Sequence, residues 1–278
     1  MNNNILQNQI ESLLSLSSNF SEKIEVTTYN ININKLDKKL NGLTIAQISD
    51  LHINKWNLEL IEHTIDVLNK INPDIVAITG DIICNGSKFI PDLIRLFKKI
   101  NCRYGIYSCI GNHDHSDGGN SLKIQAAYKK CNVQALVNDS TMVNINGAEL
   151  YIAGADDLQL GEQNISQMIK NISDTSKAIF LTHNPINFKE FAKYNPELVL
   201  AGHTHGGQLN SKIFGLFYKI LANTQYVSGL YSMNKSLLYV NRGIGTALLG
   251  PKFFNKKILI RTPRINSKPE ISLFKLIS

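Results

Sequence analysis

Residues 43–52 read LTIAQISDLH, and this stretch decides the fold class. The run LTIAQIS has the continuous apolar character of a buried strand, and two polar side chains, Asp50 and His52, follow at its end. Apolar residues then recur at helical steps over 58–71, up to a proline. The segment DIVAITGD, residues 74–81, predicts a second strand followed by an aspartate. Strand, helix and strand in this order predict an α/β fold.

The same alternation continues along the chain. Two further helices are predicted, over 93–100 and 121–131. Further strands are predicted for YGIYSCIG (104–111), a hairpin around Asn146-Gly147 (141–153), AIFLT (178–182), ELVLAG (197–202), YVSGLY (226–231), SLLYVN (236–241) and ISLFKLI (271–277). Because no internal repeat or Pro-rich linker interrupts them, we expect a single domain over 24–278 with a β-rich C-terminal part, preceded by an N-terminal extension, 1–23.

Composition excludes several classes of protein. Hydrophobic residues make up 43% of the chain, a globular value that excludes disorder throughout. The four cysteines show no CxxC spacing, which argues against a disulfide scaffold or a cysteine zinc site and favours a reducing compartment. No run reaches the roughly 20 apolar residues of a spanning helix. Residues 5–20 predict a short helix packed on the body, or alternatively a membrane-surface helix.

Polar side chains of one chemical type follow five predicted strand ends. They are Asp50, His52, Asp81, Asn112, His183, His203 and His205. Because ligands bind at the carboxyl ends of strands in open α/β sheets, we expect these side chains to converge. Oxygen and imidazole donors without thiolate suit Mn, Fe, Zn or Mg. Seven donors are too many for one tetrahedral site and predict two metals about 3.5–4 Å apart, bridged by one carboxylate.

These residues form motifs that resemble a known family. The motifs Asp50-Leu-His52, Gly80-Asp81, Gly111-Asn112-His113-Asp114, His183 and Gly202-His203-Thr204-His205 look like the five motifs of the calcineurin-like metallophosphoesterases. A bacterial branch of membrane-associated phosphodiesterases is similar over about residues 24–278, notably at AGADD (153–157), GHTHGGQ (202–208), SGLY (228–231) and LYVNRGIGT (238–246). That branch includes UDP-2,3-diacylglucosamine pyrophosphatases of lipid A synthesis. The resemblance implies a four-layered α/β/β/α sandwich.

The resemblance also implies a role for each matching residue. Asp81 would bridge two metals, one held by Asp50, His52 and His205 and the other by Asn112, His183 and His203. His113 is not needed as a ligand and would protonate the leaving oxygen, with Asp114 orienting its imidazole. Soluble diacylglucosamine pyrophosphatases carry Arg in place of His113, so the chain resembles a His-bearing branch. Many members of that branch have an N-terminal membrane helix, which is not predicted here.

The charge distribution bears on the substrate. The net charge is +7, and no acidic residue lies between Glu197 and Glu270. The same interval holds ten cations: Lys212, Lys219, Lys235, Arg242, Lys252, Lys256, Lys257, Arg261, Arg264 and Lys268. A basic solvated face explains part of this pattern. A basic surface with interleaved apolar runs also suits an anionic, amphiphilic substrate or an anionic membrane surface.

The expected function is therefore a dinuclear, metal-dependent phosphoesterase. It would hydrolyse a phosphodiester or pyrophosphate bond by metal-activated hydroxide, with two divalent ions, first of all Mn. The favoured substrate is lipid-linked, such as UDP-2,3-diacylglucosamine, which would place the protein in the cytoplasm, peripherally on the inner face of the cell membrane. The alternatives are a nucleotide or nucleic-acid phosphodiesterase, although no nucleic-acid module is apparent, and a non-catalytic scaffold. The substrate, native metal and oligomeric state stay open.

Three residues beside the motifs have two interpretations each. His115 is expected to be a solvated loop histidine, with substrate contact as the alternative. Asp156 and Asp157 are expected to be exposed in a turn, with a substrate contact or support of the metal ligands as the alternative.

Overall fold

The computed structural model describes most of the chain from residue 24 onward. The described residues are 24–33, 37–83, 86–116, 121–207, 224–246, 248–249, 252–253, 256–257, 260–261, 264 and 267–277. The expected helical segment at 5–20 lies outside them.

The first sheet has six strands in the order β1-β16-β2-β3-β4-β5. Their bounds are Glu25–Asn32 (β1), Glu270–Ile277 (β16), Thr44–Ile48 (β2), Ile75–Thr79 (β3), Ile106–Cys109 (β4) and Val133–Ala135 (β5). The strands β2 to β5 run parallel to one another, whereas β16 runs antiparallel to β2. The two ends of the described chain pair here, since β1 lies parallel to β16 with Glu25 opposite Glu270.

The second sheet also has six strands, in the order β10-β11-β9-β8-β7-β6. Their bounds are Gly229–Met233 (β10), Ser236–Val240 (β11), Leu198–Ala201 (β9), Ala178–Leu181 (β8), Ala148–Gly154 (β7) and Asp139–Ile145 (β6). The strands β7, β8, β9 and β11 are parallel. Four two-residue strands form separate pairs, β12 (Leu248–Leu249) with β15 (Ile260–Arg261) and β13 (Lys252–Phe253) with β14 (Lys256–Lys257).

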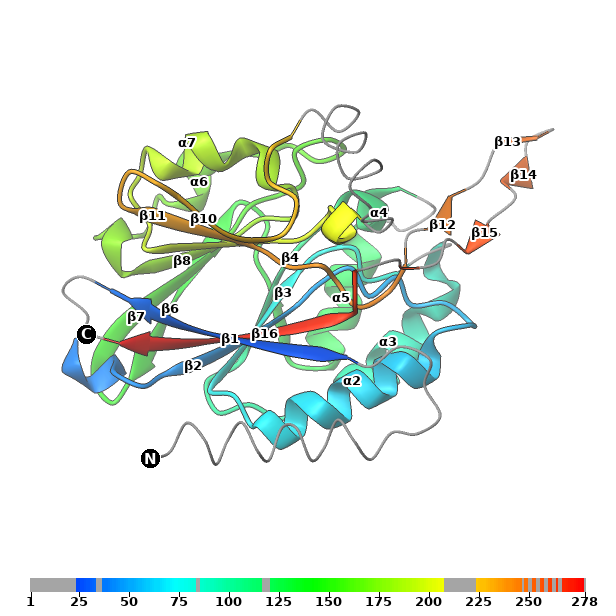
Figure 1. The fold of residues 1–278 in the computed structure, drawn as a ribbon, viewed down its shortest axis with the longest axis horizontal. Helices are drawn as coiled ribbons and strands as arrows, with labels where there is room; N and C mark the ends of the chain where they lie inside the picture. The colour runs from blue at the N-terminus through cyan, green and yellow to red at the C-terminus, as the bar shows by residue number, and fades with distance from the viewer. Residues whose placement is uncertain are drawn as a thin grey trace.

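Helices cover the outer face of each sheet (Figure 1). On the first sheet lie α2 (Leu58–Ile71), α3 (Ile90–Phe97) and α5 (Ser121–Lys130), and on the second lie α6 (Ile165–Met168) and α7 (Phe188–Ala192). Single turns fill the connections: α4 (Asn112–His115), η1 (Lys38–Leu40), η2 (Gly86–Phe89), η3 (Thr175–Lys177), η4 (Pro185–Asn187) and η5 (His205–Gly207).

Three apolar clusters hold these layers together. One joins α2, α3 and α5 to the first sheet, and another joins α6 and α7 to the second. The third lies between the two sheets and includes Ile45, Leu150 and Leu200. Removing this apolar surface from water is the main stabilising contribution to such a sandwich. The predicted four-layered α/β/β/α sandwich is therefore confirmed.

Most predicted elements are confirmed, with differences at their ends. The second predicted helix ends at Phe97 and not at residue 100, because residues 98–99 form a turn. The strand predicted at 226–231 begins at Gly229. The strands β1 and β5, the two-residue strands β12 to β15 and the short helices α4, α6 and α7 were not predicted.

Candidate metal centre

The structure brings all seven candidate ligands to one place. Asp50, Asp81 and Asn112 follow β2, β3 and β4 of the first sheet, while His183 and His203 follow β8 and β9 of the second. Since β3 packs across from β8, the carboxyl ends of the parallel strands from both sheets meet at one edge of the sandwich. The expected convergence is confirmed.

The candidate ligands form two adjoining groups. In the first, the Nε2 atoms of His52 and His205 lie 3.0 Å apart, and His205 Nε2 lies 3.5 Å from Asp50 Oδ1. In the second, His183 Nε2 lies 3.2 Å from Asp81 Oδ2 and 3.1 Å from His203 Nδ1. Asn112 completes the second group, because its Oδ1 lies 3.0 Å from His203 Nδ1 and 3.1 Å from His183 Nε2.

One carboxylate connects the two groups. Asp81 Oδ2, 3.2 Å from His183 Nε2, is also 3.7 Å from His52 Nε2. The same carboxylate accepts the backbone N–H of His113 at Oδ1, 2.8 Å away. Asp81 therefore stands where a bridging ligand between two ions would stand.

The donor set fits cations. His183 donates Nδ1–H to the carbonyl oxygen of Thr79 at 2.8 Å, which fixes the tautomer and leaves the Nε2 lone pair directed at the centre. His183 Nε2 lies 3.1 Å from Asn112 Oδ1 and 3.1 Å from His203 Nδ1, and these last two atoms lie 3.0 Å apart. A cation among the three atoms would interact favourably with all of them at once. The residues present thus fit divalent metal ions with oxygen and nitrogen preference.

The electrostatics favour the same interpretation. Burial lowers the pKa of His52 to about 3 and, with help from the nearby His183, that of His203 to about 4. Both imidazoles are therefore neutral near pH 7, the form that binds metals. Burial opposes a charge on His183 too, but the Asp81 carboxylate outweighs it and raises the pKa of His183 to about 10. The field at His183 Nε2 thus favours positive charge.

The backbone at the candidate ligands is unusual. Five of the seven residues adopt the left-handed conformation: Asp50 (φ 50°), His52 (φ 43°), Asp81 (φ 56°), His203 (φ 73°) and His205 (φ 51°). Non-glycine residues rarely adopt this conformation, and the strain gathers at functional sites. These five residues follow the ends of β2, β3 and β9.

His113 and Asp114 lie on the single turn α4, beside these groups. The His113 ring meets the His52 ring edge-on, with ring centroids 4.9 Å apart, and it lies within reach of His52 and Asp81 as a further donor. Asp114 is buried, and its carboxylate accepts the backbone N–H groups of Asp81, Ile82 and Gly111 at 2.8–2.9 Å. Asp114 thereby ties α4 to the loop after β3. Its expected orientation of His113 stays a prediction.

The expected exposure of Asp156 and Asp157 is wrong. Both are buried, because each carboxylate accepts nearby backbone N–H groups, those of Asp157 and Glu162 in the case of Asp156. Asp156 also pairs with Nε2 of His115 at 2.7 Å. His115 is therefore not a solvated loop residue. Sequence pattern alone did not indicate this pair, since 41 residues separate its members.

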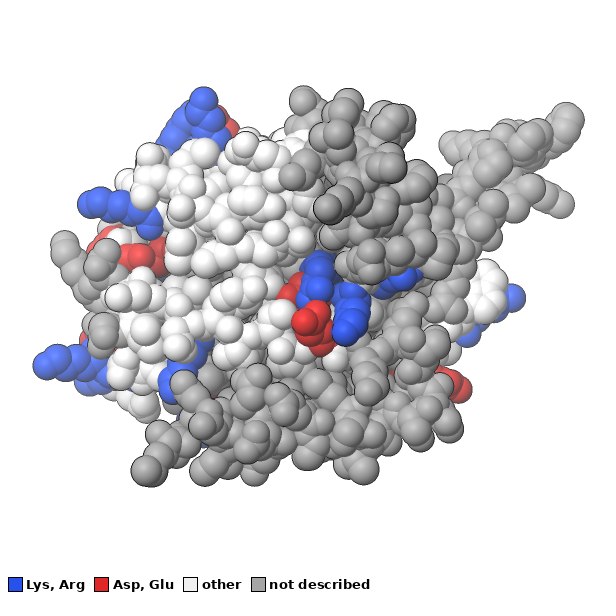
Figure 2. All heavy atoms as spheres, in the orientation of Figure 1, with Lys and Arg blue, Asp and Glu red and all other residues white. Residues whose placement is uncertain are grey.

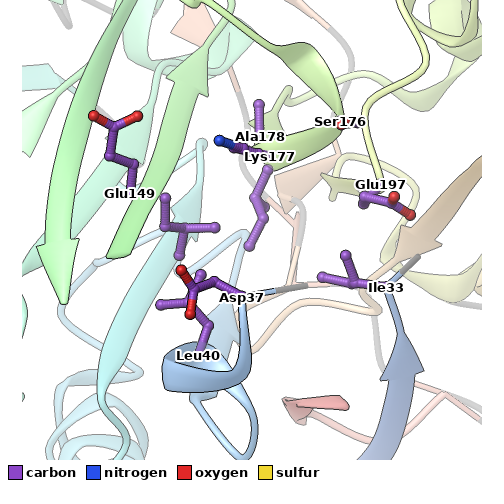
Figure 3. Close-up of a pocket in the computed structure, with 10 residues that line it drawn as sticks. Ile33, Asp37, Leu40, Glu149, Ser176, Lys177, Ala178 and Glu197 are labelled. Carbon is purple, nitrogen blue, oxygen red and sulfur yellow. The ribbon is translucent and has the colours of Figure 1, made fainter. Parts of the chain in front are cut away.

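A cavity of about 200 Å³ lies away from the centre, at the amino-terminal ends of β8 and β9. Figure 3 shows Asp37, which caps η1, and Leu40 of η1 on one side of it and Lys177 and Glu197 on the other. No candidate ligand lines this cavity. The cavity therefore takes no part in the chemistry of the candidate metal centre.

Within the cationic interval between Glu197 and Glu270, Arg242 already has carboxylate partners. Arg242 pairs with Glu25 Oε2 at 2.7 Å and with Glu270 Oε2 at 2.9 Å. The acids that oppose it come from elsewhere in the sequence. The side chains of Lys212, Lys219, Lys252, Lys256, Lys257 and Arg261 lie outside the described residues, so the expected basic surface is untested there.

Taken together, a sandwich of two sheets with a cation site at their shared edge defines the class of metal-dependent phosphoester hydrolases. The chain belongs to the calcineurin-like phosphoesterase family, whose model matches residues 43–207. The protein is accordingly a metal-dependent hydrolase of phosphoesters, in a family that depends on two metal ions.

Relatives over most of the chain agree with this family. The chain is 30% identical to the uncharacterized metallophosphoesterase YkuE of Bacillus subtilis, over 92% of this chain and 86% of that one. It is 28% identical to the phosphodiesterase YaeI of Escherichia coli, over 84% and 82%. It is 24% identical to the UDP-2,3-diacylglucosamine pyrophosphatase LpxG of Chlamydia trachomatis, over 80% and 84%. Two other relatives are longer, and the chain spans 58% and 53% of their lengths.

Within the described part of this chain, no helix is both long enough and apolar enough to cross a bilayer.

Proposed function

We propose that the chain is a dinuclear phosphodiesterase or pyrophosphatase in which Asp81 bridges two divalent ions. Asp50, His52 and His205 would hold one ion, and Asn112, His183 and His203 the other. The observation that carries this proposal is the position of Asp81 Oδ2, within 3.7 Å of a ring nitrogen from each group. Manganese is the first candidate, because the ligands are oxygen and nitrogen without sulfur, a set that also admits Fe, Zn and Mg.

Different residues of the chain then have different roles in the reaction. When bound, two such ions lower the pKa of a shared water and neutralise charge on the phosphoryl oxygens. Asn112 and the histidines would hold the ions in place. His113 carries the proton that the leaving oxygen needs, since its ring stands beside the centre without being required as a ligand. Asp114 keeps α4, and thus His113, against the loop after β3.

The substrate proposed is lipid-linked, such as UDP-2,3-diacylglucosamine. One support is the similarity to a relative of that named activity. A second is the exposure of large apolar side chains on loops that follow the ligand-bearing edge. Trp56 (51% exposed) follows His52, Leu158 and Leu160 (53%) follow β7, and Ile186 follows His183. Exposed apolar residues gathered around a site are typical of surfaces that bind amphiphiles.

A lipid substrate implies that the protein works at a membrane surface. We propose peripheral attachment at an anionic leaflet on the cytoplasmic side, for which the net charge of +7 is the support. Lys55 lies over the ring of Trp56, 4.7 Å from its centroid, and such a pair of amphipathic side chains suits a membrane interface. Residues 24–278 would act as one domain in this setting, with 1–23 as an extension.

The test compares substrates and variants with Mn-loaded protein. Trp56→Ser together with Leu160→Ser should lower kcat/KM for UDP-2,3-diacylglucosamine in vesicles by about 30-fold, because two apolar contacts of about 1 kcal/mol each are lost. Hydrolysis of soluble bis-p-nitrophenyl phosphate should stay nearly unchanged. Leu230→Ser is the matched control, since Leu230 is 44% exposed but lies on β10. Equal effects of both changes would contradict the apolar substrate surface, and turnover of nucleotide diesters alone would favour the nucleotide alternative.

A further inference from the structure

The short helix α4 is held by contacts to both sheets. It spans only Asn112–His115, and the backbone bonds of the turn are few: Ser116 N–H to Asn112 O, and the N–H groups of Asp114 and His115 to Gly111 O. One turn of helix is not stable by itself, because nucleation costs more than a single turn returns. Contacts from outside the turn must therefore fix its position.

One anchor belongs to the first sheet. The buried Asp114 carboxylate accepts three backbone N–H bonds, two of them from the loop after β3 at Asp81 and Ile82. Hydrogen bonds to a charged acceptor are the stronger kind. This side of α4 therefore moves with the first sheet.

The other anchor belongs to the second sheet. His115 Nε2 lies 2.7 Å from Asp156 Oδ1, and the two side chains are only 18% and 10% exposed. Asp156 is itself fixed, because its two oxygens accept the backbone N–H groups of Asp157 at 2.8 Å and Glu162 at 2.9 Å. The pair therefore crosses the seam and ties α4 to the loop after β7.

His113 directly precedes both anchors, Asp114 and His115, in the sequence. Its backbone N–H donates to Asp81 Oδ1 at 2.8 Å, and its ring meets that of His52. A rotation of α4 about the Asp114 anchor would move the His113 ring relative to the candidate metal ligands. Among the side-chain contacts described between α4 and the second sheet, Asn112 contacts His183 and His203 at the start of the turn, and the His115–Asp156 pair holds its last residue against this rotation.

We infer that the His115–Asp156 pair is a positioning contact for His113. It holds the second-sheet side of α4 and so sets the distance between the His113 imidazole and the leaving oxygen. This inference rests on the proposed role of His113 as the proton donor. His115 does not itself need to touch the substrate.

The experiment uses aryl phosphodiesters whose leaving groups rise in pKa, with the full chain loaded with Mn. His115→Phe removes the bond and keeps the ring, whereas His115→Gln offers an amide N–H near the position of Nε2. We expect His115→Phe to lower kcat about tenfold or more for the poorest leaving group and less than about threefold for p-nitrophenolate, as weakened proton donation predicts. His115→Gln should restore most of that loss, and both variants should keep two ions per chain.

Two references make the outcome decisive. His113→Ala should retain metal and show a still steeper dependence on leaving-group pKa. His63→Phe, on the outer helix α2, should leave kcat close to that of the parent at every leaving group. The positioning role would be overturned if the loss of kcat rises with leaving-group pKa in His113→Ala but is equal at every leaving group in His115→Phe. Loss of metal from His115→Phe would overturn it as well. If His113→Ala instead loses the same share of kcat at every leaving group, His113 is not the proton donor. Where His115→Phe lowers Tm strongly, Asp156→Asn, which keeps an acceptor for His115, replaces it and should show a milder slope of the same sign.

Discussion

Asp81 is the residue on which both groups of candidate ligands depend. Replacing it with Asn keeps the size of the side chain and one acceptor but removes the charge that faces His183 and His52. We expect Asp81→Asn to lower the metal content from two ions to less than one. Turnover should fall by more than about 100-fold, which is the most that is usually lost when a hydrogen-bond partner of a metal ligand is removed.

Elemental analysis of the fully loaded protein, with activity measured on the same sample, checks this prediction. Asp66→Asn is the matched control, because Asp66 is exposed on α2. Retention of two ions by Asp81→Asn would rule out the bridging position.

At the residue scale, the sequence predicted where the candidate ligands lie in the fold, whereas it missed much of their surroundings. Asp50, Asp81 and His183 stand directly after apolar runs, so their place at strand ends could be read locally. Their left-handed backbone and the Thr79 carbonyl that fixes His183 could not, because both depend on packing between strands distant in sequence. Asp156 was expected to be exposed for the same reason: its partner His115 comes from the other sheet.

The strand exits are the elements that shape the centre, and Gly80 after β3 is one of the crowded positions there. Its φ is +81°, and a Cβ there would lie 2.7 Å from the backbone nitrogen of Gly111 and 2.8 Å from His183 Nδ1. Gly80→Ala should therefore combine left-handed strain of about 1–2 kcal/mol with a clash that displaces His183. We expect a loss of stability above about 2 kcal/mol and a weakened metal site.

Gly229 separates the two effects, because its φ is +86° but nothing lies within 4 Å of a Cβ placed there. Gly229→Ala should cost only the strain, about 1 kcal/mol, and should leave metal binding unchanged. Urea denaturation and metal titration of both variants check the prediction. If Gly80→Ala and Gly229→Ala behave alike in both measurements, close packing at the β3 exit is not what positions His183.

Elements were predictable where their pattern is local. Strands β3, β8 and β9 are continuous apolar runs, and α2 repeats apolar residues at helical steps, so each was found from its own residues. β1 was missed because EVTTYNIN becomes a strand by pairing with β16, more than 200 residues away. The turns α6 and α7 are too short to show a helical period.

At the scale of the whole molecule, a buried polar network joins the two sheets near the start of β16. The Glu270 carboxylate accepts bonds from Thr27 and Tyr239 at Oε1 and from the Arg242 backbone N–H and Nε at Oε2. Tyr239 belongs to β11 of the second sheet, while Thr27 belongs to β1 of the first. Figure 2 shows charges of both signs together in this region.

Glu270→Gln should destabilise the protein although the shape is conserved. Donors point at both oxygens of Glu270, so the amide NH2 of Gln would face a donor in either orientation. Arg242 would keep Glu25 but lose its charged hydrogen bonds to Glu270, which costs about 1.5–3 kcal/mol. Urea denaturation measures the loss, and Glu59→Gln on the exposed side of α2 is the control, with an expected change below about 0.5 kcal/mol.

The same network predicts how this difference depends on pH. Burial alone would raise the pKa of Glu270, but the bonds and charge of Arg242 outweigh it and hold that pKa below the ordinary value of 4.5. A carboxyl group with a lowered pKa in the folded state stabilises the fold fully above its unfolded pKa and loses that contribution as the pH falls through the folded value. The difference in free energy of unfolding between the parent and Glu270→Gln should therefore be constant above about pH 5.5 and shrink below about pH 4. Denaturation curves from pH 3 to 8 measure it. A difference that stays constant down to pH 3 would mean that the charge of Glu270 contributes nothing, and that its hydrogen bonds alone join the sheets.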